Sequence, residues 1–132
     1  MTYVTDTHAL IYFATRDLRR MSAAATRIFH RAREQRDRVH VPVVCLFELA
    51  LLLERGRVRS RMSFVEWHAM LAREAGLPLE PLTWGDVSEA RGLAALGDPF
   101  DRLIAGTAVR LDAPLITSDE RIRRSGLVPT VW

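Results

Sequence analysis

Along the chain, short runs that are apolar or that switch between apolar and polar residues alternate with longer segments. In the longer segments, apolar residues recur every three or four positions. The short runs predict strands at residues 2–5, 38–41, 77–83, 113–119 and 128–132. The longer segments predict helices at residues 6–14, 22–36, 63–76 and 98–112, with further helices beginning at Pro42, Thr83 and Asp119. Strands separated by helices predict an α/β fold, with a central parallel sheet of four to five short strands and helices on both faces.

Residues that begin and end helices support these assignments. Ser63 and Glu66 have the spacing of a capping box, and Gly76 is expected to close the helix that follows. Asp98 is expected to cap the next long helix, because Pro99 fits its first position.

The composition predicts an ordinary globular protein with one domain spanning residues 1–132. Hydrophobic residues make up 48% of the chain and charged residues 27%, and no repeat or linker divides it. Cys45 is the only cysteine and lies in an apolar run, so we expect a buried, reduced thiol. No leader-like segment or membrane-length apolar run is found, so a cytoplasmic protein without a membrane contact is expected.

The charge pattern narrows the possible chemistry. The formal charge is +3, and every basic side chain apart from histidine is an arginine. The absence of lysine excludes a P-loop and Schiff-base chemistry. The mild positive charge favours polyanionic partners.

Four acidic residues, distant in sequence, are expected at one edge of the predicted sheet. Asp6 and Asp119 each follow a predicted strand, Glu48 lies early in the helix after the second strand, and Asp101 lies in the first turn of its helix. The loops beyond the carboxyl ends of parallel strands form the binding crevice of such folds. Glu48 is notable because it interrupts the apolar run VVCLFELALLL at residues 43–53.

Each acid also has an ordinary structural interpretation. The aspartates at positions 6, 98 and 119 could cap helices, and Asp101 could pair with Arg102 or Arg110 on a solvent-exposed face. Glu48 fits an ordinary interpretation least well, because an unpaired carboxylate among apolar residues is unfavourable.

Gathered together, the four acids would require neutralisation. Two carboxylates about 5 Å apart repel by roughly 3 kcal/mol at an effective dielectric constant near 20. Protonation, arginine partners or a divalent cation could relieve this repulsion. An all-oxygen ligand set without a histidine or cysteine cluster favours Mg²⁺, with Mn²⁺ possible, over zinc. Such a cation suits the activation of water against a phosphate.

Four segments carry a resemblance to a known family. They are VTDTHALIYF (4–13), VCLFELALLLERGR (44–57), DPFDRLIAGTA (98–108) and LITSDERI (115–122). Together they resemble the PIN-domain ribonucleases, and specifically the VapC-like toxins of type II toxin–antitoxin systems. The resemblance extends over essentially the whole chain, and DPFDRLIA is its most specific motif.

The resemblance implies a Mg²⁺-dependent endoribonuclease, in which a metal-activated water cleaves RNA phosphodiester bonds. Asp6, Glu48, Asp101 and Asp119 would be the catalytic, metal-binding acids. The resemblance also implies an RNA substrate, with tRNA among the candidates, a homodimer, and a cognate antitoxin whose segment blocks the acidic pocket. An arginine of that antitoxin could compete with the metal for the acids.

Supporting roles are expected for residues around the acids. Thr117 or Ser118 would orient Asp119 or a water molecule, and Asp98 is expected to cap its helix rather than to bind the metal. The chain departs from the family in two positions: Cys45 stands where relatives often have serine, and Leu96 where many have histidine.

Basic and aromatic residues suggest further contacts. The arginines Arg57, Arg59 and Arg61 follow the helix that carries Glu48 and are candidates for binding the RNA backbone. His8 could contact RNA or a leaving group, although a lone histidine at a helix start is more often structural. The tryptophans are expected in the core or in a dimer interface, at positions 67, 84 and 132.

Two other classes of protein fit part of the pattern. The chain could be a catalytically inactive PIN-like binding module whose acidic pocket binds a partner's arginines. A phosphatase or phosphotransferase resembling the haloacid-dehalogenase group would carry a second aspartate two residues after the first. That position is His8, and the supporting lysine is absent.

Overall fold

A five-stranded parallel sheet forms the centre of the computed structural model, which describes residues 1–132. The strand order is β3-β2-β1-β4-β5, and every neighbouring pair is parallel. The strands are β1 (Thr2–Thr5), β2 (Arg38–Pro42), β3 (Leu79–Glu80), β4 (Leu115–Ile116) and β5 (Thr130–Val131). The predicted α/β fold and parallel sheet are therefore confirmed, with strands shorter than several of the sequence runs.

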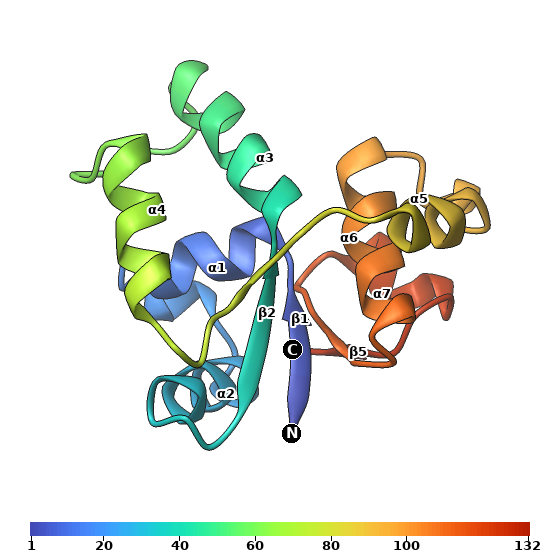
Figure 1. Ribbon diagram of the computed structural model, residues 1–132, viewed down its shortest axis with the longest axis horizontal. Coiled ribbons are helices and arrows are strands. Elements are labelled where there is room, and N and C mark those ends of the chain that lie inside the picture. The colour runs from blue at the N-terminus through green and yellow to red at the C-terminus, as the bar shows by residue number, and fades with distance from the viewer.

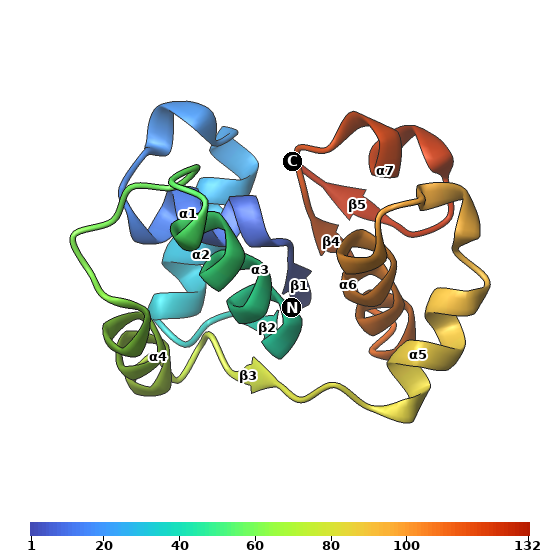
Figure 2. The same ribbon diagram turned by 90° about the horizontal axis from the view of Figure 1, so that it is seen from above.

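Helices cover both faces of the sheet, as expected. They are α1 (Thr7–Ala14), α2 (Ala23–Arg33), α3 (Val43–Glu54), α4 (Phe64–Arg73), α5 (Trp84–Arg91), α6 (Pro99–Arg110) and α7 (Glu120–Ser125). Helices α1 to α4 lie on one side of the sheet and α5 to α7 on the other (Figures 1 and 2). This division follows from right-handed crossovers, because the chain moves outward from β1 to β3 and then returns across the sheet to β4 and β5.

A contiguous apolar core of 28 buried residues joins the sheet to its helices. Val39 and Val41 of β2 are fully buried, and Trp67 of α4 and Phe29 of α2 are the largest fully buried side chains. Trp67 thus lies in the core, as expected, whereas the Trp84 side chain at the start of α5 is 78% exposed.

Most helix starts agree with the sequence. Ser63 and Glu66 form the predicted capping box of α4, and Asp98 caps α6 with Pro99 in its first turn. The predicted role of Gly76 was wrong, because α4 already ends at Arg73.

Gly76 is needed for close packing instead of helix termination. A Cβ at this position would lie 1.7 Å from the carbonyl oxygen of Ala32, near the end of α2. The Gly76 carbonyl also accepts a hydrogen bond of 2.9 Å from the Val39 N–H. The segment after α4 can therefore pass α2 and enter the sheet only without a side chain here.

A network of charged side chains fixes α6 to α5 and to the edge of the sheet. Arg110 near the end of α6 donates 2.6 Å hydrogen bonds to Asp86 of α5 and to Glu80 of β3. His40 of β2 lies 2.9 Å from the second oxygen of Glu80. The Asp86 side chain is fully buried, so Arg110 compensates a charge that has no access to water.

None of the helices combines the length and the apolar composition that crossing a bilayer would require.

Candidate active site

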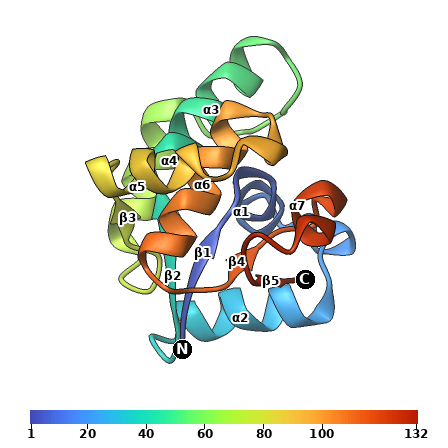
Figure 3. The same ribbon diagram turned by 90° about the vertical axis from the view of Figure 1, so that its right-hand side faces the viewer.

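Four elements bring the predicted acids to the carboxyl edge of the sheet. Asp6 directly follows β1, and Asp119 follows β4, the neighbouring strand. Glu48 lies in α3, which starts where β2 ends, and Asp101 lies in the first turn of α6. A helix that returns the chain to a parallel strand begins at the carboxyl edge. Accordingly, the first turns of α1 and α6 lie close together above β1 (Figure 3).

All four acids line one cavity of about 280 Å³. Its remaining lining residues are Thr7, His8, Tyr12, Asp98 and Ser118. Five carboxylates therefore face a common space, and no lining residue is an arginine. The convergence expected from the parallel topology is present in the structure.

Three of these aspartates also cap helices. One Oδ1 atom accepts a backbone N–H in each case: Asp6 from Ala9 at 2.8 Å, Asp98 from Asp101 at 3.0 Å, and Asp119 from Arg121 at 2.8 Å. Each cap is formed through the Oδ1 atom, so the second carboxylate oxygen of each aspartate is not used for capping. Helix capping and a role in the cavity are therefore compatible, and capping fixes where each carboxylate points.

Glu48 and Asp101 have no such structural role. Glu48 is half-buried on α3 and faces the cavity rather than the apolar core. The suggested pairing of Asp101 with Arg102 or Arg110 was wrong. Arg102 donates to the carbonyl oxygen of Ala90 at 3.0 Å, and Arg110 is held by the two acids of the sheet-edge network.

The electrostatics of the cavity show unbalanced negative charge. None of the five carboxylates forms an ion pair. Burial, together with repulsion from the other four carboxylates, raises the pKa of Asp101 to about 7. Burial also raises the pKa of Asp6 to about 6, although the Thr117 hydroxyl and the Ala9 N–H partly offset it.

The donor set fits a hard divalent cation. All charged groups in the cavity are carboxylates, which Mg²⁺ and Mn²⁺ prefer over nitrogen or sulfur ligands. No three acidic, histidine or cysteine side chains are yet arranged closely enough to hold a metal ion. The site therefore has suitable ligands without preformed coordination.

The expected supporting residues lie beside the acids. The Thr117 hydroxyl is buried and accepts a 3.0 Å hydrogen bond from the Asp119 N–H, while Ser118 lines the cavity. Cys45 is fully buried, with its sulfur 3.7 Å from the carbonyl oxygen of Thr5, and burial raises the pKa of its thiol. The thiol thus contacts the strand that positions Asp6 without lining the cavity.

The three candidate arginines for RNA are all exposed in the segment that follows α3. Arg57 and Arg59 line a second cavity, of about 750 Å³, that shares His8 and Tyr12 with the acidic one. Arg61 lines a separate cavity, together with Arg59. Sequence reasoning did not identify Tyr12, although its position four residues after His8 places both on one face of α1.

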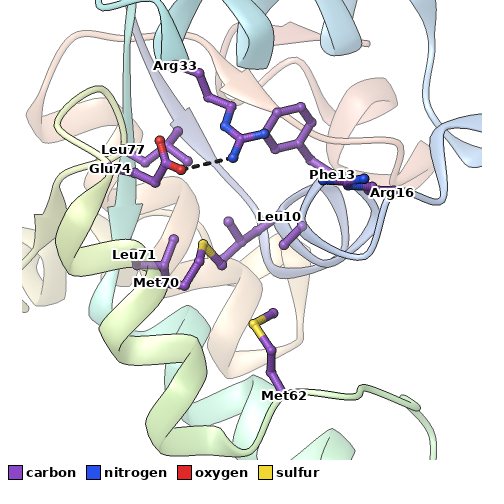
Figure 4. A pocket seen from close by; sticks show the side chains of 10 residues that line it. Leu10, Phe13, Arg16, Arg33, Met62, Met70, Leu71, Glu74 and Leu77 are labelled. Atoms are coloured by element: carbon purple, nitrogen blue, oxygen red, sulfur yellow. Dashed lines mark hydrogen bonds and ion pairs between the residues drawn. The ribbon is translucent and has the colours of Figure 1, made fainter.

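Another cavity, of about 200 Å³, lies between α1, α2 and α4 and is mainly apolar (Figure 4). Leu10, Met70 and Leu71 are among its lining residues. The Arg33 guanidinium donates to Glu74 at 3.0 Å and lies 5.6 Å from the centre of the Phe13 ring. This cavity contains none of the clustered acids.

Comparisons with known proteins agree with this architecture. The family model of the PIN domain matches residues 3–126. Ribonuclease VapC22 of Mycobacterium tuberculosis is 31% identical over 133 residues, covering 99% of this chain and 98% of that protein.

Three solved structures share the fold. VapBC2 from Rickettsia felis, bound to a DNA fragment from its promoter, has a TM-score of 0.68 and 14% identity, covering 99% of this chain and 98% of the other. VapBC-1 from nontypeable Haemophilus influenzae has a TM-score of 0.63 and 18% identity, with coverages of 99% and 97%. A toxin–antitoxin complex from Klebsiella pneumoniae has a TM-score of 0.62 and 15% identity, with coverages of 97% and 96%.

The match to the family model extends over nearly the whole chain, and a relative 31% identical aligns over almost its full length. The chain therefore belongs to the PIN-domain family, as a VapC-like member.

Proposed function

We propose that this protein is an Mg²⁺- or Mn²⁺-dependent endoribonuclease and the toxin component of a two-protein toxin–antitoxin module. One observation carries the proposal: acids from four separate elements line a single cavity with no cationic side chain to balance them. The similarity to a protein named as a ribonuclease supports RNA as the substrate.

The chain's own residues would have distinct tasks. Asp6, Glu48, Asp101 and Asp119 would hold the cation through their carboxylate oxygens. When bound, a divalent cation supplies Lewis-acid activation of water and neutralises charge on the phosphate. The Thr117 hydroxyl would hold the backbone of Asp119 in place through the 3.0 Å hydrogen bond it accepts.

Two further side chains would support these ligands. Asp98 would serve α6 as its N-cap, which sets the position of Asp101 through the 3.0 Å hydrogen bond. Ser118, at the cavity wall, would interact with a water molecule or with the substrate.

An antitoxin is the proposed protein partner. The three structural neighbours are described as VapBC or toxin–antitoxin complexes, which supports a partner of this kind. The cavity between α1, α2 and α4 would accept apolar side chains of that partner, because seven of its ten lining residues are hydrophobic. A partner arginine reaching the acidic cavity would take the place of the cation.

A second copy of the chain is also proposed as a partner. Phe47 on α3 is 59% exposed, and its ring centre lies 6.0 Å from that of Phe100 on α6. Val43, one turn before Phe47, and Trp84 are exposed as well. Exposed apolar side chains of this size favour an interface between copies.

RNA cleavage tests the enzymatic proposal directly. Purified protein would be incubated with total RNA in Mg²⁺ or Mn²⁺, with EDTA, and as the Asp6→Asn and Asp101→Asn variants. We expect discrete cuts only for the unaltered protein with a cation. Asp112→Asn is a matched control, because this exposed aspartate lies outside the cavity. Cutting that persists in EDTA or in both cavity variants would contradict the proposal.

An inactive binding module is the alternative, and the three capping aspartates are the observation that favours it. Their carboxylates have a structural use that needs no cation. Isothermal titration with Mn²⁺ separates the two functions. Binding that is lost in Asp101→Asn supports the enzyme, whereas absent binding together with tight binding of an arginine-containing peptide supports the module.

A further inference from the structure

A large open cavity adjoins the acidic one and has a different chemical character. Its volume is about 750 Å³, and it shares only His8 and Tyr12 with the acidic cavity. Its other lining residues are Ile11, Thr15, Asp17, Arg20, Leu52, Arg57, Val58 and Arg59. The two cavities are therefore neighbouring parts of one depression, joined at two aromatic side chains.

Helices α1 and α3 form the walls of this depression. Three of the lining residues, at positions 8, 11 and 12, lie on one face of α1, which begins beside Asp6, and Thr15 follows as its C-cap. On α3, Glu48 lines the acidic cavity and Leu52, one turn later, lines the second. At about 1.5 Å per helical residue, Tyr12 lies about 9 Å along α1 from its capping aspartate.

Tyr12 presents a partly exposed aromatic ring beside a histidine ring and an arginine side chain. Its ring is half-buried, and its centre lies 6.2 Å from the exposed His8 ring. The Arg20 guanidinium carbon lies 5.7 Å from the centre of the Tyr12 ring, and Asp17 holds this arginine at 3.2 Å. An aromatic ring flanked by a guanidinium is a surface on which a nucleobase stacks.

The charges change sign between the two cavities. The first is lined by five carboxylates, whereas the second is lined by Arg20, Arg57 and Arg59 with a single acid, Asp17. A polyanion whose reacting phosphate lies at a cation in the first cavity would find its adjoining phosphates opposite these arginines. Arg57 and Arg59 form no ion pair within the protein, so they are available for such contacts.

We propose that the second cavity is a nucleotide subsite, in which a base adjacent to the scissile phosphate stacks on Tyr12 while Arg57 and Arg59 bind the backbone. This inference rests on the proposed ribonuclease function. A paired base cannot present its face to Tyr12, so the occupant is a single-stranded segment. Tyr12 contributes to substrate binding rather than to the chemical step.

The test combines a protein change with an RNA change. The probe is a fluorescein-labelled single-stranded RNA of about twelve nucleotides that contains one cleavage site, together with a copy lacking the base beside that site. Cleavage in Mn²⁺ gives KM and kcat, and fluorescence anisotropy in EDTA gives Kd without cleavage. The proteins are the unaltered chain, Tyr12→Leu, Tyr12→Phe, Arg57→Gln and, as an arginine control, Arg91→Gln on α5.

We expect Tyr12→Leu to raise KM and Kd about tenfold and to leave kcat within twofold, because stacking is present before and during the reaction. Tyr12→Phe retains the ring and should bind like the unaltered protein. With the RNA that lacks the base, the KM and Kd of the unaltered protein should rise by the same tenfold. The KM and Kd of Tyr12→Leu should rise little further with this RNA. This coupling requires contact between ring and base, so a merely structural role of Tyr12 would not produce it. Arg57→Gln should flatten the salt dependence of Kd, and Arg91→Gln should not.

Equal KM values for Tyr12→Leu and Tyr12→Phe would overturn the subsite and leave the ribonuclease intact. Losses of binding affinity from Tyr12→Leu and from removal of the RNA base that are independent of each other would have the same meaning. Such a result would favour a protein segment as the occupant of the cavity. Conversely, absence of cleavage by the unaltered protein, with the coupling still present in Kd, would refute the ribonuclease and retain the subsite. Absence of any RNA binding would refute both.

Discussion

Replacing Asp6 by asparagine should stabilise the cation-free protein at neutral and alkaline pH while removing a proposed metal ligand. Asparagine is also a good N-cap, so its side-chain oxygen can keep the hydrogen bond from the Ala9 N–H. What disappears is a buried negative charge with no ion-pair partner. The variant therefore separates the structural use of this residue from its charge.

The magnitude follows from the two pKa values. The pKa of Asp6 is about 6 in the folded protein, compared with an ordinary value of 3.8, and burial is the main cause. The unfolded chain loses this proton first, so the free energy of unfolding falls as pH rises through the interval between the two values. A difference of about 2 pKa units corresponds to about 3 kcal/mol, of which about 2.5 kcal/mol is lost between pH 4 and pH 8.

Urea unfolding in EDTA at pH 4, 6 and 8 measures this effect. The unaltered protein and Asp6→Asn should have nearly equal stability at pH 4. At pH 8, Asp6→Asn should be more stable than the unaltered protein by about 2–3 kcal/mol. Mn²⁺ at pH 8 should then stabilise the unaltered protein more than the variant, because binding to the folded state adds to its stability. A stability difference that is independent of pH would refute the electrostatic reasoning.

Other consequences of the structure can be checked in the same way. Gly76→Ala should destabilise the fold by more than 3 kcal/mol in urea unfolding, since the new methyl group overlaps the backbone of α2; Gly92→Ala, with a negative φ and ordinary contacts, should be neutral or slightly stabilising. Arg110→Met should lower the free energy of unfolding by about 3–5 kcal/mol because it leaves the buried Asp86 carboxylate without its cationic partner, and the double variant with Asp86→Leu should recover much of this loss. Cys45 should resist iodoacetamide at pH 8 in the folded protein and react in urea, because burial raises the pKa of its thiol. Mass spectrometry follows the labelling, and rapid labelling without urea would show that the thiol is accessible.

The local signals of the sequence were sufficient for most of the fold. Ser63 with Glu66, and Asp98 with Pro99, act through side chain–backbone contacts only a few residues apart, so their spacing alone located two helix starts. The placement of the acids followed from topology, because parallel strands place their carboxyl ends at one edge.

Contacts between distant segments could not be read in this way. Gly76 looked like a helix terminus, but its role depends on a carbonyl 44 residues earlier in the chain. The bonds of Arg110 to Asp86 and Glu80 span 24 and 30 residues, and nothing local distinguishes this arginine from one in solvent. Tyr12 was missed because an aromatic residue on an apolar helix is normally a core residue.

The positions of the acids in the sequence also determine when the complete set of carboxylates can assemble. Asp6 and Glu48 are translated before Asp101 and Asp119, and more than 50 residues separate Glu48 from Asp101. Strand β4, which must pair with the central β1 to bring Asp119 into place, begins 110 residues after β1 ends. A chain in which β4 has not yet paired with β1 therefore has an incomplete set of carboxylates, so the proposed cation site can form only after this late, long-range pairing.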